Sequence, residues 1–129
     1  MAKEQLTLKV LNSSFGICRL AAAAKIPNWF NKEEINFYSI TRSKEELSIV
    51  CPEKIIPKTI QAELGWRALK VKGPLDFNLT GILSSIAKPL ADNSISIFAV
   101  STYNTDYILI RREDFTEAVE ILKNDFAVE

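Results

Sequence analysis

The chain has 129 residues, enough for one domain or two very small ones. Hydrophobic residues make up 47% of it and charged residues 25%, an ordinary composition for a globular protein in water. Sixteen basic residues balance sixteen acidic ones, so the sequence predicts no nucleic-acid partner and no charge barrier to self-association.

The first half of the chain is predicted to consist mainly of strands. Gln5–Leu11 alternates between polar and apolar residues, and Phe15–Leu20 follows a turn cluster, so we expect an N-terminal hairpin. Ala21–Ala24 lacks an amphipathic face and is predicted to be a loop. A helical turn, two strands and a short helix or turn follow, at Ile26–Phe30, Ile35–Thr41, Glu46–Cys51 and Pro52–Ile56.

The second half has stronger patterns and reads β-α-β-β-α-β. Asn78 is predicted to cap a helix with one apolar stripe, which Pro89 should kink or end. Asp114 and Glu117 resemble a capping box at the start of a second helix. Strands are predicted at Trp66–Lys72, Ile95–Val100 and Tyr107–Ile110, with a last edge strand within Asp125–Val128. This order is the ferredoxin-like arrangement, with two helices on one face of an antiparallel sheet.

An internal repeat relates the two halves. Ile35–Ile55 aligns without a gap on Ile95–Phe115, at an offset of 60 residues, mainly through its apolar pattern. Each half would then be a strand-helix-strand-strand-helix module, at residues 1–62 and 63–129, with the first abbreviated. The alternative is that any two hairpins of similar length align this well. The bare sheet faces and edges would be covered by pairing of the modules and by a homodimer.

Catalytic and metal-binding groups are scarce. The chain has no histidine, the commonest general base and metal ligand. Cys18 and Cys51 form no CxxC pair and lie in apolar runs, so we expect buried structural thiols, with no metal and no cofactor. Without a signal peptide or a run of about 18 apolar residues, the sequence predicts a cytoplasmic protein that does not contact membranes.

Two segments of the second half, PLDFNLTGILSSIAKPLA and ISIFAVSTYNTDYILI, carry a family resemblance. They resemble the ACT domain, a small-molecule-sensing module, and more narrowly the bacterial ACT-domain proteins related to the CASTOR arginine sensors. The resemblance implies an α+β protein with two ferredoxin-like ACT modules and no enzymatic activity. It also implies a regulatory or sensor role, with an amino acid bound where two ACT modules meet.

The resemblance places the ligand between the loop and helix start after the first strand and the loop that joins the second and third strands. A glutamate that helps to bind the ligand in the arginine sensors corresponds to Leu79, which puts arginine itself in doubt. A helix start suits the ligand carboxylate, and Asp106 or Asp76 suits the ammonium. The predicted ligand-binding residues are Asp76, Asn78, Leu79, Thr80, Gly81, Thr102, Tyr103 and Asp106.

Each of these residues also has a purely structural explanation. Asn78 could be only a helix cap, Gly81 a point of close packing, Asp106 a turn residue and Tyr103 a cover for the sheet edge. One alternative function is therefore a structural or protein-interaction module that keeps the ACT fold without a ligand. Another is a small enzyme with Asp76 and Asp106 as an acid/base pair, but the sequence lacks a nucleophile elbow and a Gly-rich phosphate loop.

Overall fold

Two units make up the chain, and they interleave along the sequence. The C-terminal unit comprises Met1–Asn12 and Arg67–Glu129, and the N-terminal unit comprises Ser13–Trp66. The computed structural model describes residues 6–30, 35–73 and 80–129. The predicted division at residue 62 places the first twelve residues differently, because it assigns them to the N-terminal module.

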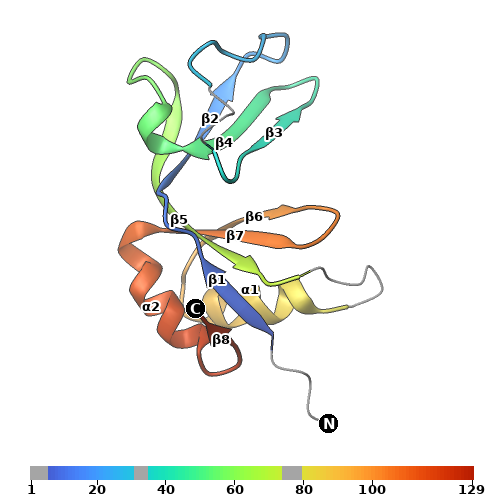
Figure 1. Cartoon of the computed structure of the whole chain (residues 1–129), viewed down its shortest axis with the longest axis vertical. Coiled ribbons are helices and arrows are strands. Elements are labelled where there is room, and N and C mark those ends of the chain that lie inside the picture. The colour runs from blue at the N-terminus through green and yellow to red at the C-terminus, as the bar shows by residue number, and fades with distance from the viewer. Residues whose placement is uncertain (1–5, 31–34, 74–79) are drawn as a thin grey trace. The chain divides into compact units, whose positions relative to one another are not determined.

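The C-terminal unit has the predicted β-α-β-β-α-β order and one additional strand. Its sheet runs β6-β7-β5-β1-β8, and β1 is antiparallel to β5 and parallel to β8 (Figure 1). The N-terminal strand is therefore inserted between the first and last strands of a ferredoxin-like sheet, and the predicted hairpin of β1 with β2 (Phe15–Leu20) does not form. The elements are β1 (Thr7–Val10), β5 (Ala62–Val71), α1 (Ile82–Asp92), β6 (Ile97–Ser101), β7 (Asp106–Arg111), α2 (Arg112–Leu122) and β8 (Ala127–Val128).

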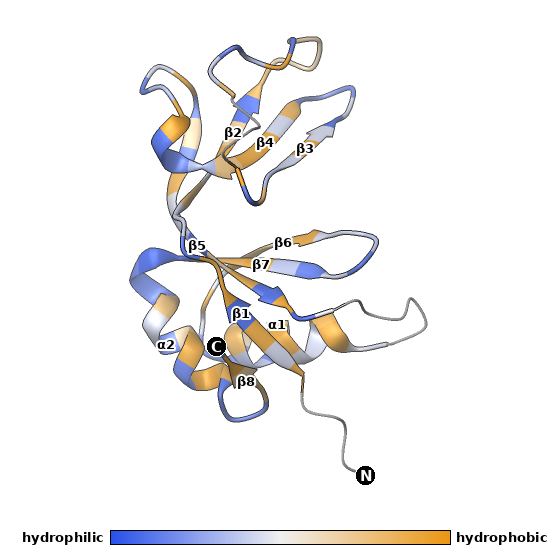
Figure 2. Cartoon of the chain, viewed as in Figure 1, coloured by the Kyte–Doolittle hydropathy of each residue, from blue (hydrophilic) through white to orange (hydrophobic). Residues whose placement is uncertain are grey.

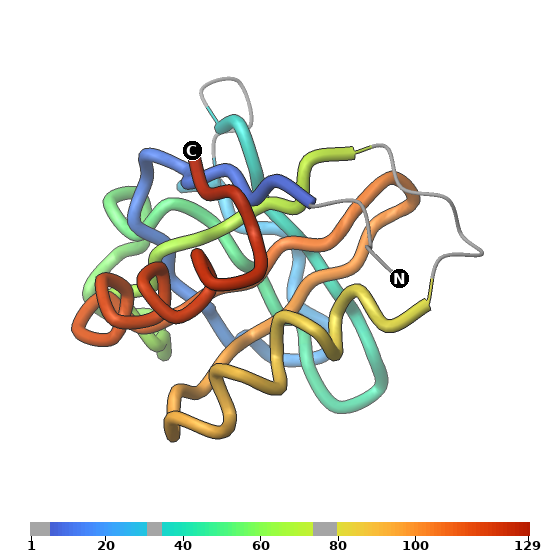
Figure 3. The backbone as a smooth tube through the Cα atoms, turned by 90° about the horizontal axis from the view of Figure 1, so that it is seen from below, coloured from blue at the N-terminus to red at the C-terminus, as the bar shows by residue number. Residues whose placement is uncertain are grey.

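Both helices cover the same face of this sheet (Figures 1 and 3). Hydrophobic and hydrophilic residues alternate along the ribbon of helix α2 (Figure 2). The side chains that this helix buries are Ala118 and Leu122. Helix α1 buries Ile86 and Leu90. The core between helices and sheet consists of Leu8, Leu69, Val71, Ile86, Leu90, Ile95, Ile108, Ile110, Ala118, Leu122 and Phe126.

The helix starts differ from the predicted ones. Helix α1 begins at Ile82 with Gly81 as its N-cap residue, whereas the predicted cap, Asn78, lies outside the described residues. Helix α2 begins at Arg112 and has no side-chain cap, so the predicted capping box of Asp114 and Glu117 is wrong. Asp114 instead lies in the first turn, where a negative charge interacts favourably with the helix dipole.

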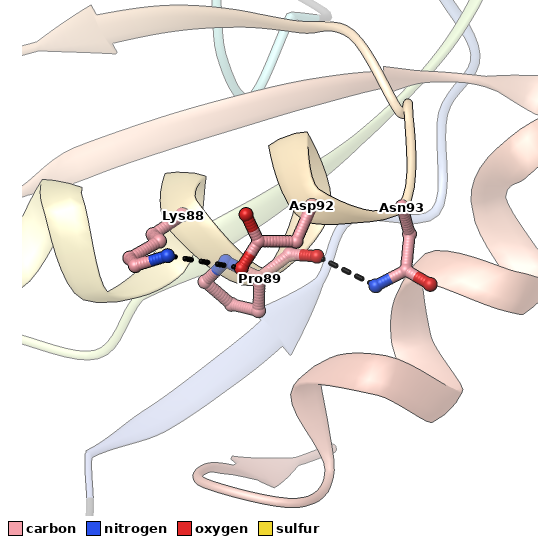
Figure 4. A network of polar contacts seen from close by, with 4 residues as sticks. All are labelled: Lys88, Pro89, Asp92 and Asn93. Atoms are coloured by element: carbon pink, nitrogen blue, oxygen red, sulfur yellow. Dashed lines mark hydrogen bonds and ion pairs between the residues drawn. The ribbon is translucent and has the colours of Figure 1, made fainter.

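Helix α1 continues for three residues beyond Pro89. Its last turn is supported from outside the backbone: Lys88 Nζ lies 3.0 Å from Asp92 Oδ2, and Asn93 Nδ2 donates a 2.8 Å hydrogen bond to the carbonyl of Pro89 (Figure 4). Helix α1 ends at Asp92, within one turn of Pro89, as the sequence predicts.

The N-terminal unit is a sheet with the ferredoxin-like strand order β3-β4-β2-β5, to which β5 contributes its first residues. Its other elements are β2 (Phe15–Leu20), β3 (Ser39–Arg42), β4 (Leu47–Pro52) and the 3-10 helix η2 (Glu53–Ile55). Helix η2 confirms the short helix or turn predicted at Pro52–Ile56, and no α-helix occurs among the described residues of this unit. Prolines interrupt both connections, and neither connection has an apolar stripe at helical spacing.

The core of the N-terminal unit contains both thiols. Cys18 on β2 and Cys51 on β4 are fully buried and unoxidised, as the sequence predicts for structural cysteines. Their side chains hydrogen-bond to each other. That hydrogen bond, together with burial, raises the pKa of the Cys51 thiol. Cys51 is therefore protonated and unreactive at neutral pH.

The hairpins β3–β4 and β6–β7 have the same register. In the first, Arg42 pairs with Leu47, and in the second Ser101 pairs with Asp106. Corresponding residues are thus 59 positions apart, one less than the predicted offset of 60. Duplication of the module remains a prediction. The loops that close the two hairpins also have hydrogen bonds in common.

Candidate functional site

The loop between β6 and β7 is closed by a compact set of hydrogen bonds. The N–H of Thr102 donates to the carbonyl of Thr105 at 2.8 Å, and the Thr102 hydroxyl donates to the same carbonyl at 3.0 Å. The N–H of Thr105 lies 3.2 Å from Thr102 Oγ1. Thr102 therefore uses its main chain and its side chain to hold the four-residue loop in one shape.

Thr105 attaches this loop to the neighbouring strand. Its hydroxyl donates a hydrogen bond to the carbonyl of Val71, the last residue of β5, and its side chain is buried. Main-chain atoms of Ala68 and Lys72 bond to β1, so the carbonyl of Val71 faces β7, the strand on the other side of β5. The predicted ligand loop thus lies beside the end of the first strand of the ACT motif.

The acidic residue of the site closes the same loop. Asp106 is half-buried at the start of β7, and Ser101 donates a 2.5 Å hydrogen bond to its Oδ1. Tyr103, at the tip of the loop, is 80% exposed. The ammonium of Lys70 lies 5.8 Å from the ring centre of Tyr107, the residue after Asp106. A carboxylate held by a short hydrogen bond at a loop end is suited to binding a cationic group.

The start of α1 has the features of an anion-binding helix end. Its N-cap residue, Gly81, has no side chain to cap the first turn, and no acidic residue lies in that turn. Gly81 has φ 77°, and a Cβ at this position would lie 3.7 Å from Ser84 Oγ, its nearest neighbour. Glycine is therefore required by the left-handed backbone, and the predicted close packing at Gly81 is wrong.

The predicted site residues fall into three groups. Thr80 and Gly81 are exposed at the start of α1, and Thr102, Tyr103 and Asp106 lie together in the β6–β7 loop. Asp76, Asn78 and Leu79 lie outside the described residues. Sequence reasoning missed Ser101 and Thr105, two hydroxyl residues that hold the loop and its carboxylate. Their spacing around the acid, S-T-x-x-T-D, was a usable signal. Across 6–30, 35–73 and 80–129, no group of three His, Cys, Asp or Glu is arranged as metal ligands.

Comparison with known proteins identifies the family. The model of the ACT domain matches residues 61–124, and a model of an N-terminal domain matches residues 13–59. The human protein CASTOR3P is 31% identical over 124 residues, which cover 86% of this chain and 76% of that protein. The chain belongs to the CASTOR-related family of ACT-domain proteins.

The curated arginine sensors of this family are longer. The cytosolic arginine sensor for mTORC1 subunit 1 from Bos taurus is 30% identical over 108 residues, 75% of this chain and 33% of that protein. The chain thus spans about a third of the length of the arginine sensors it matches.

Solved structures support the same fold. The crystal structure of protein Atu0741 from Agobacterium tumefaciens has a TM-score of 0.90 and 40% identity, and covers 98% of this chain and 94% of its own. An aspartate kinase from Clostridium acetobutylicum has a TM-score of 0.64 and 15% identity, and covers 98% of this chain and 36% of its own. The second likeness shows the fold alone. In the part of the chain that the structure describes, no helix is both long enough and apolar enough to span a membrane.

Proposed function

We propose that this chain is a non-enzymatic regulatory module that binds a free amino acid at its C-terminal ACT unit. The observation that carries the proposal is the β6–β7 loop, which is locked by Thr102, attached to Val71 through Thr105, and presents the Asp106 carboxylate. Relatives named as arginine sensors support an amino acid as the ligand class.

An amino acid offers one negative and one positive group, and the unit has a partner for each. The start of α1, at Thr80 and Gly81, suits the carboxylate, because the N-cap residue is a glycine without a capping side chain. Asp106 suits the ammonium. We further propose that Asp76, Asn78, Leu79, Thr102 and Tyr103 line the ligand, at a contact between two ACT units. The chain would act in the cytoplasm as a homodimer.

A protein-interaction module without a ligand is the second candidate. It is favoured by Leu79, which replaces a glutamate that helps to bind the ligand in the arginine sensors. It is also favoured by Tyr103, an aromatic residue at the tip of the loop whose surface is 80% exposed.

A thermal-melt screen against the twenty amino acids distinguishes the two candidates. A ligand at about 100 times its Kd adds roughly 2.7 kcal/mol to the free energy of unfolding. For a chain of this length, that raises the melting temperature by roughly 10 °C. One selective ligand is expected, and Asp106→Asn should abolish its effect.

The matched control is Ser43→Ala, which alters the corresponding loop of the N-terminal unit. It should leave the ligand-induced shift unchanged. If no amino acid at millimolar concentration shifts the melting temperature, the binding proposal is wrong and the interaction module is preferred.

A further inference from the structure

The N-terminal unit contains the same type of loop as the candidate site. Between β3 and β4, the N–H of Ser43 donates to the carbonyl of Glu46 at 2.9 Å, and the N–H of Glu46 lies 3.3 Å from Ser43 Oγ. Thr102 and Thr105 make these two contacts in the β6–β7 loop. The two loops are therefore equivalent in length, register and hydrogen bonding.

The residue pairs that close the two loops differ in charge. The C-terminal unit has Ser101 opposite Asp106, a small hydroxyl residue and an acid. At the same positions the N-terminal unit has Arg42 opposite Leu47, a long cation and an apolar residue. The N-terminal unit therefore has an apolar residue, Leu47, where the C-terminal unit has the Asp106 carboxylate, and the Arg42 guanidinium where the C-terminal unit has the Ser101 hydroxyl.

The Arg42 guanidinium has a defined partner, the turn that follows β2. Its Nη1 donates to the carbonyl of Ala22, and its Nη2 donates to the carbonyl of Ala24 at 2.7 Å. The turn is held by a 2.9 Å hydrogen bond from the N–H of Ala24 to the carbonyl of Ala21. Two nitrogens of one planar fork thus bind two fixed carbonyls.

This contact explains the alanine run, which has neither an amphipathic face nor a helix. Side chains without atoms beyond Cβ leave the main-chain carbonyls accessible to a planar cation. A second arginine also binds near the loop, since Arg19 Nη2 lies 3.3 Å from the carbonyl of Glu45. The loop after the first strand and the loop between the second and third strands are thus connected by arginine side chains.

We propose that the Ala21–Ala24 turn is a guanidinium site that the chain fills with its own Arg42. The N-terminal unit is then closed to a free ligand, whereas the C-terminal unit, with Ser101 in place of Arg42 and Asp106 in place of Leu47, is the one that binds the amino acid. This second statement rests on the proposed amino-acid binding, whereas the guanidinium site stands on the Arg42 contacts alone.

Chemical rescue tests the guanidinium site. Arg42→Ala should lower the melting temperature of the full chain, and millimolar N-ethylguanidinium should restore it in a saturable manner. Ethylammonium at the same concentration has the same charge but no fork, and should restore much less. Neither compound should stabilise the wild-type chain, because its site is filled. Equal effects of the two compounds, or equal effects on both chains, would overturn the proposal.

Arg42→Lys gives a second, independent readout. It keeps the charge but cannot bind both carbonyls through one planar group. Its melting temperature should therefore be close to that of Arg42→Ala. Faster amide hydrogen exchange at residues 22–25 in both variants would show that the loss of stability arises at the Ala21–Ala24 turn. Wild-type exchange rates in Arg42→Ala would refute the site.

The stoichiometry of amino-acid binding tests the second statement. Calorimetry with the amino acid found in the screen should give one site per chain, retained in Arg42→Ala and lost in Asp106→Asn. Two sites per wild-type chain would show that the N-terminal unit is open. If no amino acid binds, the proposed function fails, while the rescue by N-ethylguanidinium still decides the guanidinium site.

Discussion

The hydrogen bond from Thr105 to Val71 is expected to stabilise the unit as well as position the loop. Thr105→Val keeps the β-branched shape and removes only the hydroxyl. Val71 is fully buried, so its carbonyl would lose this partner away from water. A buried acceptor left without a partner costs about 1–3 kcal/mol. For a chain of this length that lowers the melting temperature by roughly 3–10 °C.

Urea unfolding, followed by tryptophan fluorescence, measures the free energy directly. Thr105→Ser is the matched variant: it keeps the hydroxyl and loses one methyl group, at a cost of about 0.8 kcal/mol. Thr102→Val is the exposed control, because water replaces its hydroxyl as a partner. The reasoning is refuted if Thr105→Val is as stable as Thr105→Ser, or if Thr102→Val costs as much as Thr105→Val.

Three further outcomes are expected. Gly81→Ala should cost about 1–3 kcal/mol in urea unfolding, because alanine is strained at the φ of 77°; an unchanged stability would contradict a left-handed N-cap. Lys72 holds the pKa of the Glu129 carboxyl below its usual 4.5, so their ion pair stabilises the fold above that pH and is lost as the pH falls through the lowered value. Lys72→Met should therefore melt below wild type at pH 7, and the difference in melting temperature should shrink as the pH falls below 4.5. Cys18 and Cys51 should resist a thiol reagent in the native chain and both react in urea; native reactivity would show that the core opens.

The strands and helices of the C-terminal unit could be predicted because each carries its own hydrophobic period. The partner of β1 could not be predicted in the same way. Alternation in Gln5–Leu11 identifies a strand, but a short turn to β2 favours a local hairpin over the observed pairing with β5 and β8. The decisive contacts come from residues about 60 or more positions away, and no local pattern encodes them.

The one-residue error in the repeat has a similar cause. In β4, Ile49, Val50 and Cys51 are all buried, so the strand is apolar on both faces and has no period of two. An alignment based on apolar residues then fits equally well at neighbouring offsets. The hydroxyl residues that begin the two loops, Ser43 and Thr102, would have set the register correctly.

The candidate site was only partly accessible to sequence reasoning. Thr102 and Asp106 were identified through the family resemblance, since neither residue type is distinctive by itself. Thr105 acquires its role only because β5 lies beside β7, and that neighbour is a property of the folded sheet. For Gly81 the sequence suggests ligand binding or close packing, whereas its structural role as a left-handed N-cap depends on where α1 begins.

The two units differ in which parts of the ACT module they contain, and this difference bears on ligand binding. Within the described residues, the N-terminal unit has no α-helix after its first strand, so it lacks a helix end for a carboxylate, and its loop is closed by Arg42. The C-terminal unit has the start of α1 at Gly81 and, at the position that corresponds to Leu47, the Asp106 carboxylate. A zwitterion needs both partners at once. The described part of the N-terminal unit has neither an α-helix start nor a carboxylate at that position, so variants of its loop are the appropriate controls for the proposed site.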